Sequence, residues 1–407
     1  MKNHRSRTLV LATVLHAFTH IYQMALTPLF LLIQNFYGRD KIEDATLLLT
    51  LLLVAYFLPS YPMGILADRF SRKRLLSIGL VINGLGFIGL ALAPTYSLAI
   101  ASVVVAGLGG SFFHPSATAL VARLYPGKAG RALGLLGIGA SIGFFIGPFY
   151  AGWRAKIAHD WRVPVLELGI AGLVGAALFA WLADEHGAEP SKEPHALKPK
   201  EPMFPTPTLW LMFLLAALFF FFRDFAGSSM STVGSLFLQK ARGFDVERTG
   251  FTISFIFLAS AISNPLFGHL SDGSRMKWAA VLMVISAVLV AIFPRVPNEW
   301  ILPALLAYGF FFMASYPIVE AALMESVPDA VRGRVFGLFI TIGGLLGNLS
   351  HWIDGRWVES FGPRIHDEQP YRSLYGWLAI FLLISLAGLP CLRAIRRREM
   401  ALAKTPH

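Results

Sequence analysis

Long apolar runs separated by short polar segments dominate the sequence. A helix that crosses a bilayer needs about 20 consecutive apolar residues, and runs of this length fall in two successive sets of six. The pattern therefore predicts an all-α membrane protein with 12 transmembrane helices. The predicted spans are 8–35, 46–67, 75–93, 97–122, 131–153 and 164–183, followed by 207–238, 247–271, 277–294, 299–325, 333–356 and 373–392.

The two sets of spans are expected to form two bundles joined by a linker. Residues 184–206 contain five prolines among charged residues and show no hydrophobic periodicity. The sequence from Gly64 to Asp68 after the second span is echoed from Gly268 to Asp272 after the eighth. This repeat predicts pseudo-twofold symmetry, with a substrate site between the bundles near the membrane midplane. The predicted parts are an N-terminal six-helix bundle (1–183), a cytoplasmic linker (184–206), a C-terminal six-helix bundle (207–392) and a basic cytoplasmic tail (393–407).

Composition and charge agree with a membrane protein. Only 14% of the 407 residues are charged, against about 25% in soluble domains, and the mean hydropathy is +0.60. The net charge of +11 would suggest a nucleic-acid partner in a soluble protein, but the charges lie between apolar runs, so we expect the bilayer as partner and no nucleic acid. With the N-terminus inside, 22 Lys and Arg residues fall on the cytoplasmic side and 12 on the other. This bias predicts a multi-pass protein of the plasma (bacterial inner) membrane with both termini in the cytoplasm.

Cysteine chemistry and cofactors are not expected. The single cysteine, Cys391, cannot form an internal disulfide, and one thiolate cannot build a zinc or iron–sulfur site. We assign no cofactor and no metal.

Two motifs resemble signatures of the major facilitator superfamily. Gly64-x-Leu66-Ala67-Asp68-Arg69, followed by basic residues up to Arg74, is similar to the signature loop of that superfamily. A glycine series in the fifth span resembles its antiporter motif. Its spacing near four also places Gly139, Gly143 and Gly147 on one helix face, which predicts close approach of a partner helix. The resemblance implies the major facilitator fold, and the antiporter motif implies exchange of two solutes rather than uniport. The residues of that motif are Gly134, Gly143, Gly147, Pro148 and Gly152.

Further residues resemble the fosmidomycin-resistance branch of efflux proteins within that superfamily. They are His16 and His20 in the first span, the sequence from Gly110 to Pro115 in the fourth, a basic residue in the seventh, and the sequence from Glu325 to Pro328 at the end of the tenth. His20 and Ser116 stand where that branch has acidic residues.

The first span carries a polar stripe. Thr13, His16, His20, Gln23 and Thr27 follow at steps of three and four residues, so they share one helix face. His16 and His20 fall on the order of 12 and 18 Å into a ~30 Å hydrocarbon core. Because ionisable residues inside a membrane are costly and histidine titrates near neutral pH, this pair is a candidate proton carrier or substrate contact. An interhelical hydrogen bond and a metal site shared with His114 are the alternatives.

The second half supplies its own charged candidates. We expect Arg223 to contact an anionic group of the substrate and Asp224 to act as a coupling carboxylate; the alternative is that both pair with other helices. Neighbouring positions do not share a helix face, which argues against a simple ion pair between them. The sequence Ala226-Gly227-Ser228-Ser229 favours a break in this helix.

The fourth and tenth spans carry equivalent proline sites. His114-Pro115 and Tyr316-Pro317 are candidate hinges, because proline removes a backbone donor. His114 and Tyr316 are expected to line the pathway, and Glu320 is the carboxylate of the second half expected inside the bilayer.

Charged residues at the cytoplasmic helix ends are candidate gates. We expect Asp68, Arg69 and Arg72 to form a latch with Arg131, and Asp272 one with Arg334. Glu325 is expected to pair with Arg332 or Arg334. The alternative is that the arginines only set the membrane orientation.

Together these patterns predict a proton-coupled antiporter that exports small amphipathic or anionic toxic compounds by alternating access. Its partners are then a small-molecule substrate, protons and lipid, and a monomer is expected. A symporter or uniporter for a nutrient anion, sugar or metabolite on the same fold is the alternative. A transition-metal carrier and a membrane enzyme are weaker rivals.

Overall fold

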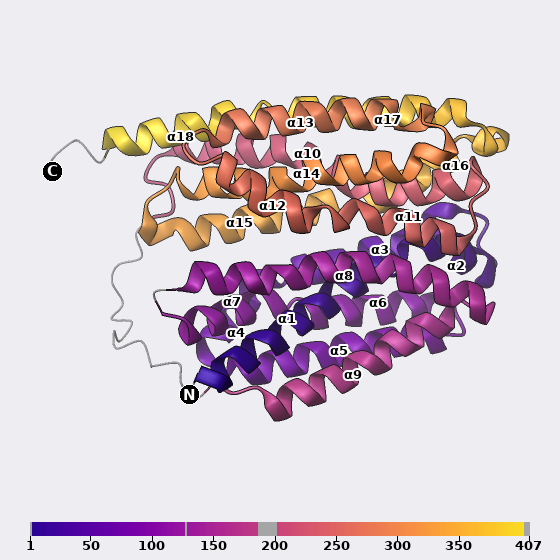
Figure 1. The fold of residues 1–407 in the computed structure, drawn as a ribbon, viewed down its shortest axis with the longest axis horizontal. Coiled ribbons are helices and arrows are strands. Elements are labelled where there is room, and N and C mark those ends of the chain that lie inside the picture. Colours follow the sequence, from indigo (N-terminus) through magenta and orange to yellow (C-terminus); the bar gives the residue numbers. More distant parts are fainter. Residues whose placement is uncertain (1, 127, 186–201, 403–407) are drawn as a thin grey trace. The chain divides into compact units, whose positions relative to one another are not determined.

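The computed structural model describes residues 2–126, 128–185 and 202–402. Helices and connecting turns make up this part of the chain, which contains no strand (Figure 1). The helices of the first half are α1 (Lys2–Met24), η1 (Thr27–Leu29), α2 (Phe30–Phe36), α3 (Ile42–Phe57), α4 (Ser60–Arg69), α5 (Arg72–Leu92), α6 (Tyr96–Gly110), α7 (Phe113–Leu124), α8 (Ala129–Ala158) and α9 (Arg162–Leu182). Those of the second half are α10 (Pro207–Lys240), α11 (Val246–Leu258), α12 (Ser260–Leu270), α13 (Arg275–Ile292), η2 (Phe293–Arg295), η3 (Asn298–Trp300), α14 (Ile301–Met324), α15 (Asp329–Gly347), α16 (Ser350–Glu359), η4 (Gly362–His366), α17 (Glu368–Ser385) and α18 (Gly388–Leu402).

The helices fall at the positions that the apolar runs predict. Within the described residues, 11 helical stretches are long and apolar enough to cross a membrane. The stretch Ile42–Arg69, interrupted at Leu58 and Pro59, is not among them. The all-helical membrane architecture is therefore confirmed, while the count of twelve stays a prediction.

Several spans consist of two helices in succession. The fourth is interrupted at Ser111 and Phe112, directly before His114 and Pro115, whereas Pro317 lies inside the continuous helix α14. A break therefore occurs at the first of the two predicted hinges and not at the second. The expected break after Asp224 was wrong, because α10 runs without interruption through Ala226–Ser229.

The described structure separates into two compact units that do not follow the predicted halves. Of the described residues, unit 1 comprises those up to 185 together with 231–258 and 351–366, and unit 2 comprises 202–230, 259–350 and 367–402. Segments of α10, α11 and α16 therefore pack with the N-terminal helices. Most of the predicted linker, 186–201, lies outside the described residues, as does the end of the tail after Leu402. Before that point, the tail arginines from Arg393 to Arg398 extend the helix α18.

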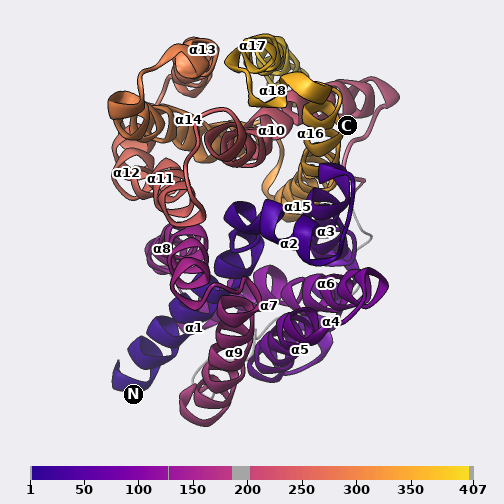
Figure 2. The same ribbon diagram turned by 90° about the vertical axis from the view of Figure 1, so that its right-hand side faces the viewer.

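Each unit has its own layer of packed helices. In unit 1, α5 packs between α6 and α9, and α1 packs against α8. Figure 2 looks along the helices and shows α13 beside α17 and α14 in unit 2. An apolar core in unit 2 joins these elements, with Phe220 of α10, Met283 of α13 and Phe339 of α15 all buried. These layers hold α1 and α7 in unit 1, and α10 and α14 in unit 2, which carry the candidate site residues.

Candidate functional site

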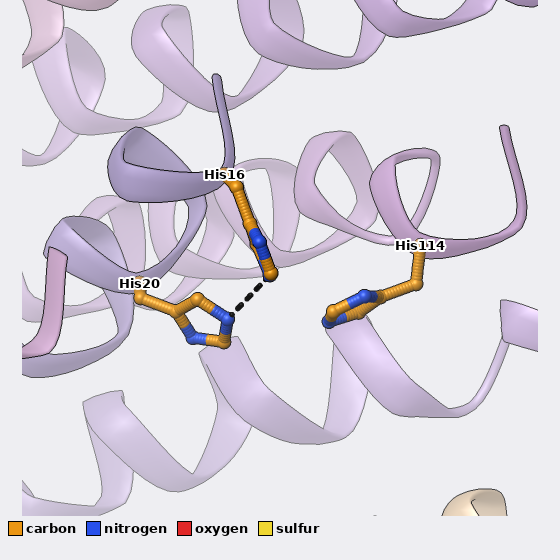
Figure 3. A group of neighbouring side chains, drawn as sticks. All are labelled: His16, His20 and His114. Atoms are coloured by element: carbon orange, nitrogen blue, oxygen red, sulfur yellow. Dashed lines mark hydrogen bonds between the residues drawn. The ribbon is translucent and has the colours of Figure 1, made fainter. Parts of the chain in front are cut away.

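Three histidines meet in the interior of unit 1. His16 and His20 lie one turn apart on α1, and His114 reaches toward them from the first turn of α7 (Figure 3). The ring centroids of His16 and His114 are 5.2 Å apart, and those of His20 and His114 are 5.8 Å apart. His16 and His20 are each 7% exposed, whereas His114 is an exposed residue. The cluster that the sequence offered as one alternative is therefore present.

Hydrogen bonds orient both rings of the α1 pair. The Nδ1 atom of His16 lies 2.8 Å from the carbonyl oxygen of Leu136 on α8, and the Nδ1 atom of His20 lies 2.8 Å from Oε1 of Gln23. The two Nε2 atoms face each other at 3.1 Å. Phe113 stacks on His16 and Phe144 covers His20, with ring centroids 4.7 and 4.1 Å apart. The buried Phe113 and the half-buried Phe144 therefore cover two imidazoles that share a short N···N contact.

The glycines of the fifth span let α8 approach α1 at backbone distance. A methyl group on Gly139 or Gly143 would collide with the carbonyl oxygen of Thr13 or Ala17, and one on Gly147 would lie 2.8 Å from the carbonyl oxygen of Ile21. The predicted close-packing face is confirmed. It holds the helix that carries the histidine pair.

Gly152 and Pro148, two further residues of the antiporter-type motif, lie against α11. A methyl group on Gly152 would lie 2.5 Å from the carbonyl oxygen of Val246 on α11, and Pro148 contacts Gly250 of the same helix. Nothing lies within 4 Å of such a methyl group on Gly134. The motif therefore packs on two different helices of unit 1, and its proposed role in exchange stays a prediction.

A buried charged cluster lies in unit 2. Arg223 donates hydrogen bonds to Oδ1 of Asp224 from Nε at 2.9 Å and from Nη2 at 2.7 Å. The argument that these neighbours would not pair was wrong. A long arginine side chain can bend back along its helix, so the guanidinium reaches a carboxylate whose Cβ points in another direction. The Asp224 side chain also packs on α15, where Gly343 and Gly347 leave room for it.

Tyr316 covers the arginine. The guanidinium carbon of Arg223 lies 4.1 Å from the centre of the Tyr316 ring, a cation–π contact between α10 and α14. Glu320 follows one turn later on α14, within electrostatic range of Arg223. Arg223 is only 1% exposed, and among the described residues its buried Nη1 has no hydrogen-bond partner. Arg223, Asp224, Tyr316 and Glu320 therefore form one group, with one donor of the guanidinium unused.

The candidate gate residues find other partners than the expected ones. Arg275 pairs with both Asp272, at 3.0 Å, and Glu325, in place of the predicted arginines. Arg332 instead donates to the carbonyl oxygen of Met324 at 2.8 Å. Sequence reasoning missed Arg275 at the first turn of α13, although Ser274-Arg275 echoes Ser71-Arg72 of the first half. A cavity of about 300 Å³ lies beside it, lined also by Lys277, Arg393 and Arg396.

The gate of the first half stays a prediction. Arg69 and Arg131 are exposed and Arg72 is half-buried, while the side chain of Asp68 lies outside the described part of the structure.

Unit 1 also joins the two halves of the chain at the end of α1 remote from the N-terminus. Ser235 of α10 donates to the carbonyl oxygen of Thr27 at 2.7 Å, and the backbone N–H of Trp352 on α16 donates to Thr50 of α3 at 2.9 Å. Lys156 at the end of α8 lies 2.9 Å from Asp245. Burial raises the pKa of the Asp245 carboxyl, but the backbone N–H of Arg248 and the Lys156 ammonium outweigh it, so the pKa lies below its usual value.

Sequence reasoning missed a second buried polar group in unit 1. His351 and Asp354 on α16 are 2% and 0% exposed, and Nδ1 of His351 lies 2.6 Å from the hydroxyl oxygen of Thr232. Two ionisable residues three positions apart within the predicted span 333–356 were a usable signal, because such residues rarely face lipid.

Comparison with known proteins decides the family. The sequence profile described as Major Facilitator Superfamily matches residues 9–350. The chain belongs to the Major Facilitator Superfamily. Proteins of this superfamily are transporters, so the rival interpretation as a membrane enzyme is excluded. Together with the eleven apolar helical stretches found in the described residues, this membership implies a multi-pass inner-membrane protein.

The relatives of this superfamily member include drug-resistance proteins. The chain is 25% identical over 337 residues to the multidrug resistance protein MdtH of Shigella dysenteriae serotype 1, with 79% of each chain covered. It is 22% identical over 377 residues to the fosmidomycin resistance protein of Escherichia coli strain K12, with 90% of each covered. The resemblance noted from the motifs is thereby confirmed.

Solved structures agree on the fold. Crystal structures of a bacterial homologue of the human lysosomal transporter Spinster, in the inward-facing conformation, match with TM-scores of 0.78 (unoccupied) and 0.81 (occupied). Their sequence identities are 18% and 17%, and each match covers 98% of this chain and 99% of the other. At this identity the likeness shows the major facilitator fold alone.

Proposed function

We propose that this transporter is a proton-coupled antiporter that exports small amphipathic or anionic toxic compounds. The observation that carries the proposal is the buried contact between His16 and His20, whose Nε2 atoms are 3.1 Å apart. Both Nδ1 atoms already have acceptors, so the facing Nε2 atoms are the positions where an added proton would bind and be shared. The names of the relatives, multidrug resistance and fosmidomycin resistance, support export of toxic compounds.

The charged group of unit 2 supports an anionic or amphipathic substrate. Arg223 offers an unused buried donor, Nη1; its guanidinium is hydrogen-bonded to Asp224 and lies within electrostatic range of Glu320. An anion would displace Tyr316 from the guanidinium to reach it, because the arginine is 1% exposed. Protonation of Asp224 would release Arg223 for such an anion, which gives a physical link between proton and substrate.

Alternating access would require the contacts of unit 1 at the far end of α1 to break. These are mainly neutral hydrogen bonds, such as that from Ser235 to Thr27, and exposed ion pairs of Lys156. Contacts of this kind contribute on the order of 1 kcal/mol each or less. An equilibrium between a closed and an open far end is therefore accessible to the energy of substrate and proton binding. We assign this end to the outside of the cell, with both termini in the cytoplasm.

The decisive experiment is transport by the purified protein in proteoliposomes with an imposed pH gradient. The panel includes fosmidomycin and amphipathic cations and anions, and proton flux is followed with an internal pH indicator. Substrate flux against the direction of proton flow is expected in the wild type. It should be lost in His20→Gln and retained in His366→Ala, a variant of an exposed histidine in unit 1. Substrate flux in the same direction as the protons would instead establish the rival symporter. Substrate flux without any proton movement would establish the uniporter.

A further inference from the structure

The tautomers of the α1 histidines follow from their partners. A backbone carbonyl oxygen can only accept, so Nδ1 of His16, 2.8 Å from the oxygen of Leu136, carries the hydrogen. A neutral imidazole has one N–H, and Nε2 of His16 is therefore a free lone pair. The amide oxygen of Gln23 lies 2.8 Å from Nδ1 of His20 and can likewise only accept, so this Nδ1 also carries the hydrogen. Nε2 of His20 is therefore a free lone pair as well.

Two lone pairs thus face each other in a buried setting. The Nε2 atoms lie 3.1 Å apart, as the dashed line in Figure 3 marks. Neutral rings in these tautomers have no hydrogen to place between them, so the pair repels unless a cation lies there. Histidines that ligate a metal show this same pattern, with the second ring nitrogen donating to a carbonyl or amide oxygen that fixes the ring.

His114 completes a set of three nitrogen ligands. Each of the three residues offers one ring nitrogen, and these atoms all lie within 4.8 Å of one another. Nitrogens on one tetrahedral zinc ion are about 3.3 Å apart, since each Zn–N bond is about 2.0–2.1 Å long. The α1 pair already has this spacing. His114 must approach by only about 1 to 2 Å, and as the exposed member of the set it has room to rotate.

The geometry points to a binding site for a divalent transition-metal ion in unit 1, ligated by His16, His20 and His114. Imidazole ligands suit zinc, nickel, cobalt and copper ions and disfavour magnesium and calcium, which prefer oxygen. Three protein nitrogens leave a fourth position for water or another small ligand on the exposed side of His114. A bound ion would join α1 to α7, two helices otherwise linked here by ring contacts. The site stands on ligand geometry alone. It uses the same Nε2 atoms as the proposed shared proton, so a bound ion and that proton exclude each other.

The test is metal binding by the full-length protein in detergent, with any affinity tag removed. Zinc is titrated in competition with a chromophoric chelator, and cobalt is followed by its visible absorption, which reports nitrogen ligation and coordination geometry. We expect one equivalent of zinc, bound at least about tenfold more weakly in each of His16→Ala, His20→Ala and His114→Ala. His351→Ala removes another buried imidazole of unit 1, hydrogen-bonded to Thr232 instead of to a second ring, and should bind as the wild type does.

The His114→Ala variant carries the most weight, because an exposed ring can be removed without a large cavity. Monodisperse elution in size exclusion verifies folding for every variant. If the wild type shows no saturable binding of one equivalent of zinc, the proposal is overturned. It is also overturned if His351→Ala lowers the affinity for zinc as much as His114→Ala does. Neither of these outcomes affects the antiporter proposal. Conversely, a protein that binds one zinc ion but shows no antiport would overturn only the antiporter proposal.

Discussion

Replacing Gly143 by alanine tests the packing that holds the histidine helix in place. The added methyl group would collide with the carbonyl oxygen of Ala17 on α1. Backbone cannot rotate away as a flexible side chain can, so α1 and α8 must separate by about 1 Å to restore ordinary van der Waals distance. Gly137, six residues earlier on α8, is the matched control, because nothing lies within 4 Å of a methyl group there.

The magnitude follows from two opposing effects. Alanine favours a helix over glycine by about 0.5–1 kcal/mol, and this gain is common to both variants. Overpacking a close contact costs about 1–3 kcal/mol, and only Gly143→Ala incurs it. The free energy of unfolding of the two variants should therefore differ by about 1–3 kcal/mol, with Gly137→Ala the more stable.

The two variants can be compared by thermal unfolding in one detergent, with the surviving monomeric fraction read from size exclusion. Transport should also fall, because a shift of about 1 Å in α1 displaces the histidine pair, and misplacements of this size cost up to ~100-fold in rate. Equal midpoints for Gly143→Ala and Gly137→Ala, or a more stable Gly143→Ala, would refute the close α1–α8 contact.

The remaining predictions address buried and exposed polar contacts. Asp224→Asn should lower stability by about 3–5 kcal/mol, because it removes the anion hydrogen-bonded to the buried Arg223. The control, Asp272→Asn, has a side chain that is 62% exposed and should change the thermal midpoint little. Equal losses in the two variants would contradict the role of burial. Ser235→Val should lower stability by about 1–3 kcal/mol, because the fully buried carbonyl oxygen of Thr27 loses the hydrogen bond that the Ser235 hydroxyl donates. Lys156→Ala should leave the midpoint nearly unchanged, since its ion pairs are exposed. A large loss in the latter variant alone would show that the exposed pairs, and not the buried hydrogen bonds, hold the far end closed.

Helix positions and a close-packing face on the fifth span could be predicted without coordinates, whereas the identity of the partner helix, α1, could not. A bilayer offers no hydrogen bonds to the backbone, so an apolar run long enough to cross it must be helical, and each run predicts one span. Glycines at a spacing of four mark one helix face whatever lies opposite, which is why Gly139, Gly143 and Gly147 were recognised as a contact surface. The polar stripe of α1 followed from the same periodicity.

Which side chains meet was decided only by the tertiary structure. Arg275 pairs with Asp272 and Glu325, for which the sequence predicted other arginines. Arg223 pairs with its chain neighbour, Asp224. The state of the histidine pair depends on the carbonyl oxygen of Leu136, 120 residues away in sequence. Periodicity specifies the direction in which a side chain leaves its helix. It does not specify the ring orientation, the tautomer or the partner, because these depend on atoms that other helices contribute once they have packed.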